Sequence, residues 1–400
     1  MTAVRSSLAA VDAVPRARLL LIGSAVASLL GGWAAAAWSL WYQTADFFCL
    51  WIGGRFVLAR DNPYDQEAWR GATAGLYPDP RGVQLPASCP GEFAYPYWTA
   101  IALAPLGALP IELAATLWMA LNIGATIGAT LLAWRVANGR ERGRGLLAAI
   151  VLSSQAFWTL LASGQLTGVM LAIVTLIAWA LASGRERIGG VAFAALLLKP
   201  QLGTFVAPAV VLDALARRRG RVLTTAVLTA ALMVVVAIVI SRGYAFQWLS
   251  SPTLARVGQV SIRSSAWGLG GEVFGDVRFG AAIIAAVVLA TARIAGVAML
   301  EPAALIAISV PLSLLATPYV SVYDFLVLAL PWAFVAAIAS RAAQAERLAL
   351  LVALVGCASL LPWVLFAIWQ TGGSMTWSAF VPITTTLLLA WALRVDRRRA

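Results

Sequence analysis

Three ionisable side chains stand out because the sequence around each of them is apolar. Asp46 follows the first hydrophobic segment and lies in the aromatic stretch 42–48. Lys199 is the only lysine of the chain and comes directly after five apolar residues, whereas Asp324 opens a later apolar run. A charge at the edge of a membrane core is costly and is usually kept for a function. A carboxylate in such a place can act as a general base, and a half-buried cation suits an anionic ligand such as a phosphate.

Each of the three residues also has a structural explanation. Asp46 is placed to cap a helix running from 47 to 58, where its side chain would bind free backbone amides. Lys199 can extend its ammonium group to the outer lipid headgroups. Asp324 can stabilise the start of a helix, because the helix dipole favours an acid there. The sequence leaves a structural and a functional interpretation open for each residue.

Other polar residues at the outer ends of apolar segments are candidates for binding. Gln165 follows a glycine at a tight turn between two apolar runs, where an amide can hydrogen-bond a sugar. Tyr97 and Trp98 are interpreted instead as aromatic anchors at the membrane interface. The remaining candidates are Tyr95, Gln201 and Tyr323 for a substrate, and Arg55, Arg256 and Arg263 beside Lys199 for an anionic group.

The composition indicates that the helices carrying these residues are embedded in a membrane. Hydrophobic residues make up 61% of the 400 and charged residues only 12%, against about 25% charged residues in soluble globular proteins. Mean hydropathy is +0.85. Apolar runs of membrane-spanning length recur from Leu19 to Leu393. We therefore expect an all-α polytopic membrane protein that forms one integral membrane domain over residues 1–400.

The net charge of +12 is explained by membrane topology rather than by nucleic-acid binding. Arginines cluster at 135–144, 217–221 and 394–399, in short links between apolar runs. This positive-inside pattern marks the cytoplasmic side of the membrane. We therefore expect no nucleic-acid partner.

The basic links fix the expected topology around the polar segments. Helix 1 at 19–40 is expected to remain uncleaved and to lead into a large outward-facing loop at 41–94 with juxtamembrane helices. Residues 95–109 are expected to be re-entrant or interfacial, because a further crossing would place the next basic link outside. Basic residues at both ends of 185–221 predict a hairpin of two short helices broken at Pro200.

The complete chain is expected to cross the membrane about 12 times with both termini inside. A second external loop is expected at 242–276. Beyond helix 1 and the hairpin, spans are expected at 111–134, 145–162, 165–183, 222–241, 277–293, 301–316, 322–340, 347–369 and 376–393.

Residue types that are missing exclude several kinds of site. The chain has no histidine, which excludes Ser-His-Asp hydrolysis and histidine-bound metals. It has no Walker loop or dinucleotide fingerprint, and its first loop has no Asp-x-Asp pair for a divalent cation. We predict neither a metal nor a cofactor. Cys49 and Cys89 share the first loop, where they either form a disulfide or remain free thiols.

The order of short motifs resembles glycosyltransferase family 87, formerly DUF2029, a group of bacterial membrane proteins. The resemblance covers residues from about 40 to 335 and rests on the ordered set rather than on any single motif. The motifs are Asp46-Phe47, residues 53–60, Asn62-Pro63-Tyr64-Asp65, Phe93-Ala94-Tyr95-Pro96 with Pro105-Leu106 and Leu109-Pro110, Gly164-Gln165, Lys199-Pro200-Gln201, and Thr317-Pro318-Tyr319 through Tyr323-Asp324.

The resemblance implies a GT-C membrane fold and a sugar donor linked to polyprenyl monophosphate. Family members include an actinobacterial α-mannosyltransferase that elongates phosphatidylinositol mannosides, so mannose is the favoured sugar. By analogy, Asp46 is the base that activates the acceptor. The chain departs from the family at Tyr97, which replaces the second proline of a Tyr-Pro-Pro segment. It also departs at 320–324, where many relatives carry histidine and this chain offers Tyr323 or Asp324.

These features together predict a membrane glycosyltransferase in the bacterial inner membrane, with its site facing the periplasm or the exterior. It would move a hexose to a hydroxyl of a lipid or glycan acceptor and invert the anomeric configuration of the sugar. Membrane lipid would surround the protein. The alternative is a transporter or flippase for a lipid-linked or anionic substrate, with Lys199 as its binding cation. A non-catalytic scaffold would leave the lone lysine and the ordered polar turns unexplained.

Overall fold

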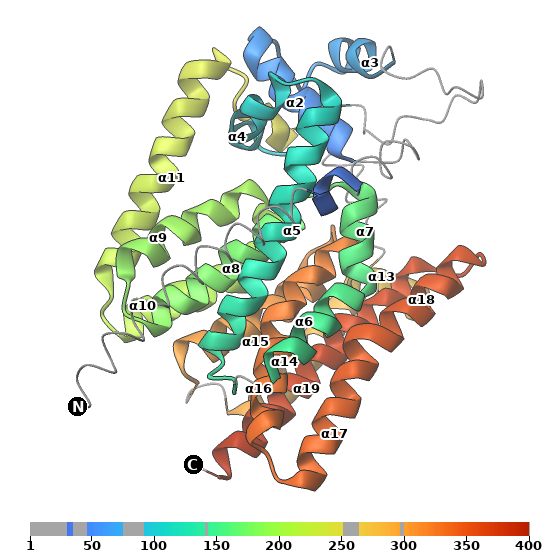
Figure 1. Ribbon diagram of the computed structural model, residues 1–400. Coiled ribbons are helices and arrows are strands. Elements are labelled where there is room, and N and C mark those ends of the chain that lie inside the picture. Colours follow the sequence, from blue (N-terminus) through green and yellow to red (C-terminus); the bar gives the residue numbers. More distant parts are fainter. Residues whose placement is uncertain are drawn as a thin grey trace, which may run out of the picture.

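The regular elements of the protein are helices. The computed structural model describes residues 30–34, 46–74, 92–140, 143–250, 264–296 and 300–399, and no strand occurs within these ranges. The expected all-α class is confirmed for this part of the chain (Figure 1). Of the predicted helix 1, only 30–34 falls among the described residues.

Most of the described residues lie in α-helices. They are α2 (Phe47–Ala59), α3 (Gln66–Ala74), α4 (Tyr97–Gly107), α5 (Ile111–Val136), α6 (Arg144–Ser153), α7 (Gln155–Ser163), α8 (Thr167–Ala182), α9 (Glu186–Ala195), α10 (Val206–Ala216), α11 (Gly220–Ser241), α13 (Ala266–Phe274), α14 (Phe279–Ala295), α15 (Pro302–Ala316), α16 (Ala329–Arg341), α17 (Gln344–Val355), α18 (Leu361–Gln370) and α19 (Phe380–Arg397). Short 3-10 segments are η2 (Leu196–Leu198), η3 (Pro200–Gly203), η4 (Gln247–Ser250), η6 (Val322–Leu328) and η8 (Met375–Ala379), and a π-helical turn covers Gly356–Leu360.

Among the described residues, five continuous helices are long and apolar enough to cross a membrane. The protein is therefore a multi-pass membrane protein. The five helices are Ile111–Val136, Gly220–Ser241, Val322–Arg341, Gln344–Gln370 and Met375–Arg397.

The span expected at 145–162 is instead a pair of helices, α6 and α7, that meet at 53°. Ser154 stands between them with extended backbone angles, and its hydroxyl accepts a hydrogen bond from the amide of Phe157 at 3.3 Å. Serine caps a new helix well, so the chain ends α6 here and starts α7 in another direction. If the bent pair forms one span, the described candidate spans number six.

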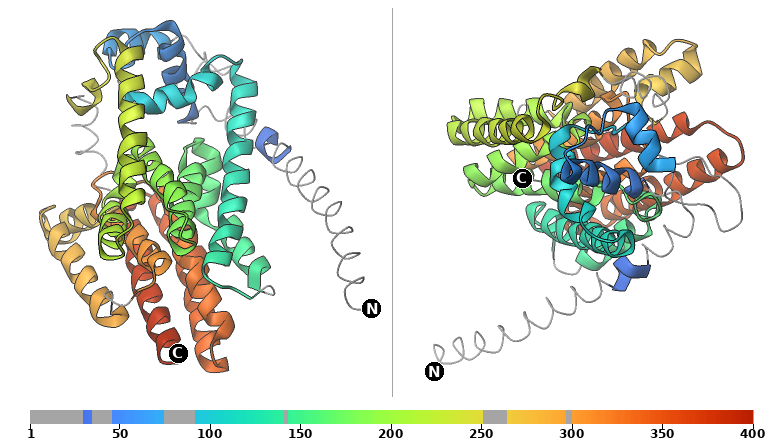
Figure 2. Two further views of the ribbon diagram at one scale, coloured as in Figure 1. Left: turned by 90° about the vertical axis from the view of Figure 1, so that its left-hand side faces the viewer. Right: turned by 90° about the horizontal axis from the view of Figure 1, so that it is seen from above.

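Helices α2, α3 and α4 gather at one end of the molecule and bridge the ends of α5 and α11 (Figures 1 and 2). The predicted helix at 47–58 is α2, and the segment expected to be re-entrant or interfacial contains α4. Gly54 lets α2 and α4 approach closely, because a Cβ atom at this position would lie 2.6 Å from the carbonyl oxygen of Leu103. Trp51 adds a hydrogen bond of 3.1 Å to the carbonyl of Leu109. Helix α2 is thus held against α4 and the residues that follow it.

The predicted hairpin between 185 and 221 is present as α9 and α10, joined through η2 and η3. Lys199 lies between the two 3-10 segments with φ −144° and ψ 74°, directly before Pro200. At the other end of the hairpin, the guanidinium of Arg219 donates to the carbonyl of Leu181 at 2.5 Å. The two basic flanks therefore lie on the same side, as the charge pattern requires, and Lys199 lies at the far end.

The segment 242–276, expected as a second external loop, contains η4 and α13. Helix α13 is held by Trp267, whose indole N–H donates to the carbonyl of Ala316 at 2.6 Å. Arg256 and Arg263 fall in 251–263, outside the described residues, and Cys89 of the possible disulfide is outside them as well.

The helix formed by η6 and α16 runs through the centre of the molecule, and every residue of its most apolar stretch is buried. It packs against α7, α8 and α19, among others. Because Asp324 lies in the first turn of this helix, its carboxylate is inside the protein. The starts of α2, α8 and η6 meet in this region, and each carries a polar side chain.

Candidate active site

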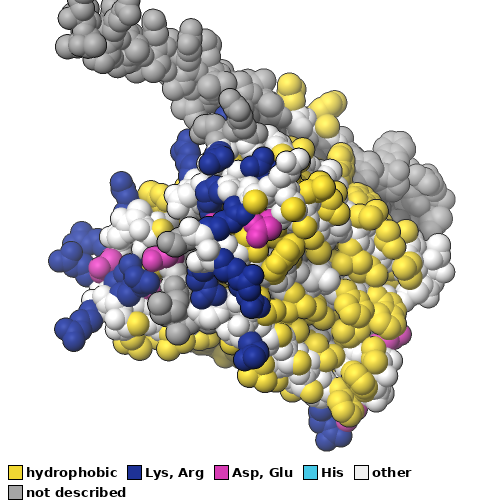
Figure 3. All heavy atoms as spheres, turned by 90° about the horizontal axis from the view of Figure 1, so that it is seen from below, with side chains coloured by type: hydrophobic (Ala, Val, Ile, Leu, Met, Phe, Trp, Pro, Cys, Tyr) yellow, Lys and Arg dark blue, Asp and Glu magenta, His cyan; other side chains and the backbone are white. Residues whose placement is uncertain are grey.

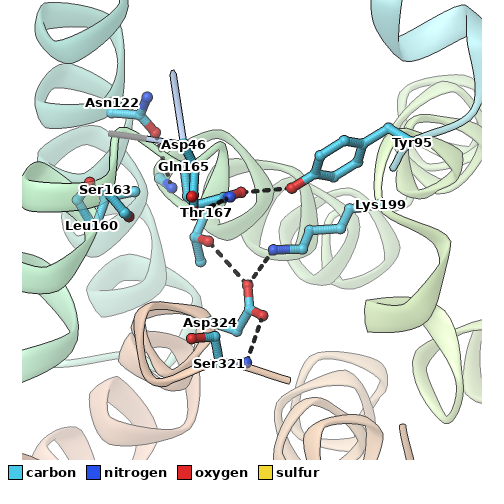
Figure 4. Close-up of polar contacts among 11 residues, drawn as sticks. Asp46, Tyr95, Asn122, Leu160, Ser163, Gln165, Thr167, Lys199, Ser321 and Asp324 are labelled. Carbon is cyan, nitrogen blue, oxygen red and sulfur yellow. Dashed lines mark hydrogen bonds and ion pairs between the residues drawn. The ribbon is translucent and has the colours of Figure 1, made fainter. Parts of the chain in front are cut away.

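The carboxylate of Asp46 is held by an ordered chain of two hydrogen bonds (Figure 4). The Gln165 amide nitrogen donates to Asp46 Oδ2 at 2.8 Å, and the Tyr95 hydroxyl donates to Gln165 Oε1 at 2.7 Å. Because the tyrosine occupies the amide oxygen, the amide nitrogen is directed at the carboxylate. Tyr95 and Gln165 are both buried.

Asp46 occupies the N-cap position of α2, but its side chain makes no capping hydrogen bond. The amides of Cys49 and Leu50 bond to its backbone carbonyl at 3.1 and 3.3 Å. The prediction that the Asp46 side chain caps this helix is therefore wrong. Its carboxylate is left for Gln165, which comes from a distant part of the chain.

A glycine turn positions Gln165 against the start of α2. Gly164 has a positive φ of 67° at the end of α7, which glycine adopts without strain. A Cβ atom there would lie 2.7 Å from the Cβ of Phe47, the residue after Asp46. The indole of Trp118 donates to the carbonyl of Gly164 at 2.7 Å. The Gly164-Gln165 turn is thus fixed on both sides.

Lys199 and Asp324 form an ion pair beside this chain of hydrogen bonds. Both side chains are completely buried, and the ammonium contacts Asp324 Oδ1. The same oxygen accepts a hydrogen bond from the Thr167 hydroxyl at 3.1 Å. The ammonium also lies 5.0 Å from the centre of the Tyr323 ring, a cation–π distance.

The prediction that Lys199 could extend to lipid headgroups is wrong, because the ammonium is buried and paired. The backbone before it is irregular, and its freed carbonyls find partners in α4. The indole N–H of Trp98 donates to Leu197 O at 2.8 Å, and the Thr99 hydroxyl donates to Leu198 O at 3.0 Å. Irregular backbone inside a membrane protein needs such partners. Since Trp98 is buried in this contact, its interpretation as an interfacial anchor is also wrong, and Tyr97 is completely buried too.

The structural interpretation of Asp324 is confirmed, and its carboxylate has further partners besides the helix start. Its Oδ2 accepts a hydrogen bond from the amide of Ser321 at 3.2 Å, which together with the Ser321 side chain forms a capping box at the start of η6. Its Oδ1 binds Lys199 and Thr167. The carboxylate therefore caps the N-terminus of η6 and neutralises the charge of the buried Lys199.

Burial sets the protonation of the groups near Asp46. It raises the pKa of the Asp46 carboxyl from its usual 3.8 to about 6, while the hydrogen bond from Gln165 and the charge of Lys199 lower it. The charge of Asp324 raises it further. Burial also raises the pKa of Tyr95 well above its usual value and that of Tyr319 to about 12, so both tyrosines stay protonated as donors. Asp46 is then mostly ionised at neutral pH, yet more basic than an exposed carboxylate.

The other predicted site residues lie in different surroundings. Arg55 is exposed on α2, roughly 14 Å along the helix from Asp46, and stacks on Trp51 at 4.8 Å. It lines a separate hollow with Asp61, so the structure does not bring it to Lys199. Gln201 is half-buried in η3. Asp61 and Asp65 are not among the predicted site residues. They flank the turn at Asn62, whose side chain accepts a hydrogen bond from the Tyr64 amide at 3.0 Å.

Two residues of the site were not found from the sequence. Thr167 begins α8 two residues after Gln165, and its position in a first helical turn was an available signal. Ser321 precedes Asp324 by three residues, the spacing of a capping box. Among the described residues, no cluster of three or more acidic, cysteine or histidine side chains could hold a metal ion.

The family model of glycosyltransferase family 87 matches residues 93–361. The chain belongs to this family. It is therefore a membrane glycosyltransferase, an enzyme that moves a sugar from a donor to an acceptor. The matched range includes Gln165, Lys199 and Asp324, whereas Asp46 precedes it. Comparison with curated proteins and with solved structures gives no match.

Proposed function

We propose that this family 87 glycosyltransferase moves a hexose, preferably mannose, from a polyprenyl-monophosphate donor to a hydroxyl of a lipid or glycan acceptor. The reaction would take place at the outer face of the bacterial inner membrane, with Asp46 as general base. One observation carries the proposal: the Asp46 carboxylate, not used to cap its helix, is directed by Gln165 toward the same buried region as the Lys199–Asp324 pair (Figure 4).

Asp46 suits the base because its pKa of about 6 leaves it ionised at neutral pH but raises its proton affinity. The acceptor oxygen attacks the anomeric carbon while the bond between that carbon and the donor phosphate oxygen breaks. The acceptor proton passes to Asp46, and the leaving phosphate takes the electron pair. One such displacement inverts the anomeric configuration.

Lys199 suits the leaving phosphate because negative charge grows there in the transition state. A lysine ammonium has three N–H donors, and Asp324 accepts from it through one oxygen. In the proposed mechanism, a remaining donor would meet a phosphate oxygen. Arg256 and Arg263 remain candidates for the same role, whereas the exposed position of Arg55 favours contact with another part of the donor or acceptor.

The long apolar helices and the shorter ones, α8, α14 and α15 among them, are consistent with a GT-C fold of about 12 spans. The helices α2 to α4 would then face the exterior, because the arginine-rich links lie at the opposite end.

The proposal is tested with the purified protein in proteoliposomes, given polyprenyl-phosphate mannose, polyprenyl-phosphate glucose or a nucleotide sugar, together with a lipid extract as acceptor. We expect a new glycosidic bond with the polyprenyl-phosphate mannose donor and an inverted anomeric configuration in the product. Transfer from the nucleotide sugar alone, or product with retained configuration, would refute the proposed donor or mechanism.

A further inference from the structure

An arginine-lined hollow lies where α14 and α19 end, far from Asp46. Its volume is about 360 Å³, and its lining consists of Arg293, Arg394, Arg397 and Arg398 with Ile294 and Gly296. No acidic side chain is part of this lining. Figure 3, which looks at this end of the molecule, shows Lys and Arg side chains gathered beside an extended hydrophobic surface, with few Asp and Glu side chains between them.

The positive-inside rule explains why arginines are frequent at this end of the molecule. It does not explain why four of them line one hollow that has no acidic side chain in its lining. Nearby arginines are paired: Arg341 contacts Asp396 at 3.4 Å, and Arg399 contacts Glu346. Within the described part of the chain, no ion pair involves Arg293, Arg394 or Arg398. These three side chains therefore form a concentrated positive charge that the described part of the chain does not neutralise.

One of the four arginines, Arg397, is used within the protein to bind backbone carbonyls at a helix end. The guanidinium of Arg397 donates to the carbonyl of Ala295 and to that of Ile294 at 3.5 Å, so it covers the free carbonyls at the end of α14. Each helix C-terminus carries only about half a negative charge. Arg397 thus serves the end of α14, whereas the side chains of Arg293, Arg394 and Arg398 have no hydrogen bond within the described part of the chain and remain for an external anion.

Exposed apolar side chains continue from the hollow along the same two helices. Leu289 lies one turn before Arg293 on α14 and is 69% exposed. Trp391 lies one turn before Arg394 on α19 and is 36% exposed. Residues three and four apart share a helix face. Each helix therefore presents an apolar side chain on the membrane side and an arginine at its end, an arrangement that matches a molecule with an acyl chain and an anionic head.

We propose that this hollow binds the phosphate headgroup of an anionic phospholipid, with Arg293, Arg394 and Arg398 as its donors and the acyl chains along Leu289 and Trp391. Guanidinium groups bind phosphate oxygens in a fork geometry, which favours a defined site over diffuse attraction. The site is distinct from the proposed catalytic region and does not depend on the donor or acceptor used there.

The test is native mass spectrometry of the full-length protein after release from vesicles of phosphatidylcholine with phosphatidylglycerol. We expect the wild type to retain phosphatidylglycerol, and the triple variant R293Q/R394Q/R398Q to retain it at least about tenfold less, because three charge-assisted contacts are lost. The matched control is R187Q/R218Q/R221Q, which removes the same charge from exposed arginines at the start of α9, after α10 and at the start of α11. The control should retain the lipid.

A thermal unfolding scan in the same detergent shows that each variant is folded, and added phosphatidylglycerol should raise the unfolding temperature of the wild type and the control only. The single variants R293Q and R398Q should each show an intermediate loss. Equal lipid retention by the triple variant and the control would overturn the proposal. So would displacement of the lipid by millimolar inorganic phosphate, because the site would then recognise a free anion.

Discussion

The carboxylate of Asp46 combines two properties that usually exclude each other, namely charge and burial. Removing a carboxylate from water favours its neutral form, whereas a donated amide hydrogen bond and a nearby cation favour the charged form. Here burial is the larger effect, and the pKa settles at about 6. At the scale of one residue, the surroundings therefore create a base that is stronger than a free aspartate and still ionised at neutral pH.

This pKa predicts how transfer depends on pH. The proposed base acts only when its carboxylate is ionised, so the transfer rate should be constant above pH 7 and fall as the pH drops through 6. At pH 5, one unit below the pKa of about 6, only about a tenth of the carboxyl groups are ionised. The measurement is the initial transfer rate in proteoliposomes between pH 4.5 and 8. A rate that stays constant through pH 6 would contradict the prediction.

A variant of Gln165 provides the control for this pH profile. Gln165→Leu removes the amide donor that favours the ionised form, so the acid limb should move to higher pH. Tyr97→Phe should leave the limb unchanged, because Tyr97 packs edge-on against Tyr244 outside this hydrogen-bond chain.

Variants of the Lys199–Asp324 pair can separate its structural role from its proposed catalytic role. Lys199→Met leaves a buried carboxylate without its partner, which costs about 3–5 kcal/mol. The double variant Lys199→Met/Asp324→Leu removes both charges and should recover part of that stability, because the capping box with Ser321 is lost together with Asp324. It should nevertheless remain inactive, because the proposed cation for the donor phosphate is lost. Thermal unfolding in detergent and the transfer rate measure the two effects. An active double variant would show that the pair is purely structural.

The sequence identified most residues of the site but not their contacts. Asp46, Lys199 and Asp324 were found because each is a charge in an apolar context. Their pairing was not predictable, because the hydrogen bond between Asp46 and Gln165 joins positions 119 residues apart and the ion pair joins positions 125 apart. The aromatic residues at 97 and 98 were misassigned, since an aromatic at the end of a span fits both a membrane interface and a buried contact.

At the scale of elements, the packing of α2 against α4 positions the helix that begins at Asp46, the proposed base. The two helices meet at Gly54, where backbone faces backbone and no side chain can move aside. Hydrophobic periodicity carried no information on this contact, because both helices are apolar on nearly every side. The hairpin of α9 and α10 was predictable, since the charge at both of its ends required an even number of crossings. The break at Ser154 was not, because one serine in an apolar run is compatible with a straight helix.

Gly54→Val tests this packing. The new side chain would begin 2.6 Å from the Leu103 carbonyl oxygen, so α2 and α4 must separate at a cost of about 1–3 kcal/mol. We expect a lower unfolding temperature and slower transfer. Gly71→Ala on α3 is the control, because nothing lies within 4 Å of the added Cβ atom. This control should match the wild type or gain slightly from the better helix former. A Gly54→Val protein as stable as Gly71→Ala would contradict the close-contact account.

At the scale of the whole molecule, α11 extends from the arginine-rich face to the face that carries α2 to α4. Its 22 residues span about 33 Å, the thickness of a membrane core. Arg218 precedes its start, whereas beyond its end the Tyr244 hydroxyl donates to the carbonyl of Asp61 at 2.9 Å. Asp61 therefore lies on the face that carries α2 to α4, and Arg218 lies on the arginine-rich face.

Cysteine labelling in intact cells tests this orientation. Asp61→Cys and Arg218→Cys, each introduced into a variant without the three native cysteines, place a thiol at the two exposed positions. A membrane-impermeant reagent should label residue 61 from the outer side and label residue 218 only after the membrane is permeabilised. The reverse pattern would place the Asp46 region inside the cell and contradict a reaction at the outer face.

The most direct test of the central claim is the transfer rate of Asp46→Asn. Asparagine keeps the size of the side chain but cannot take a proton, so the rate should fall by about 10²–10⁴-fold. Asp61→Asn makes the same change at an exposed acid fifteen positions further along and should transfer normally. Unfolding temperatures of both variants should stay near that of the wild type. If folded Asp46→Asn protein in proteoliposomes transfers sugar at nearly the wild-type rate, Asp46 is not the base.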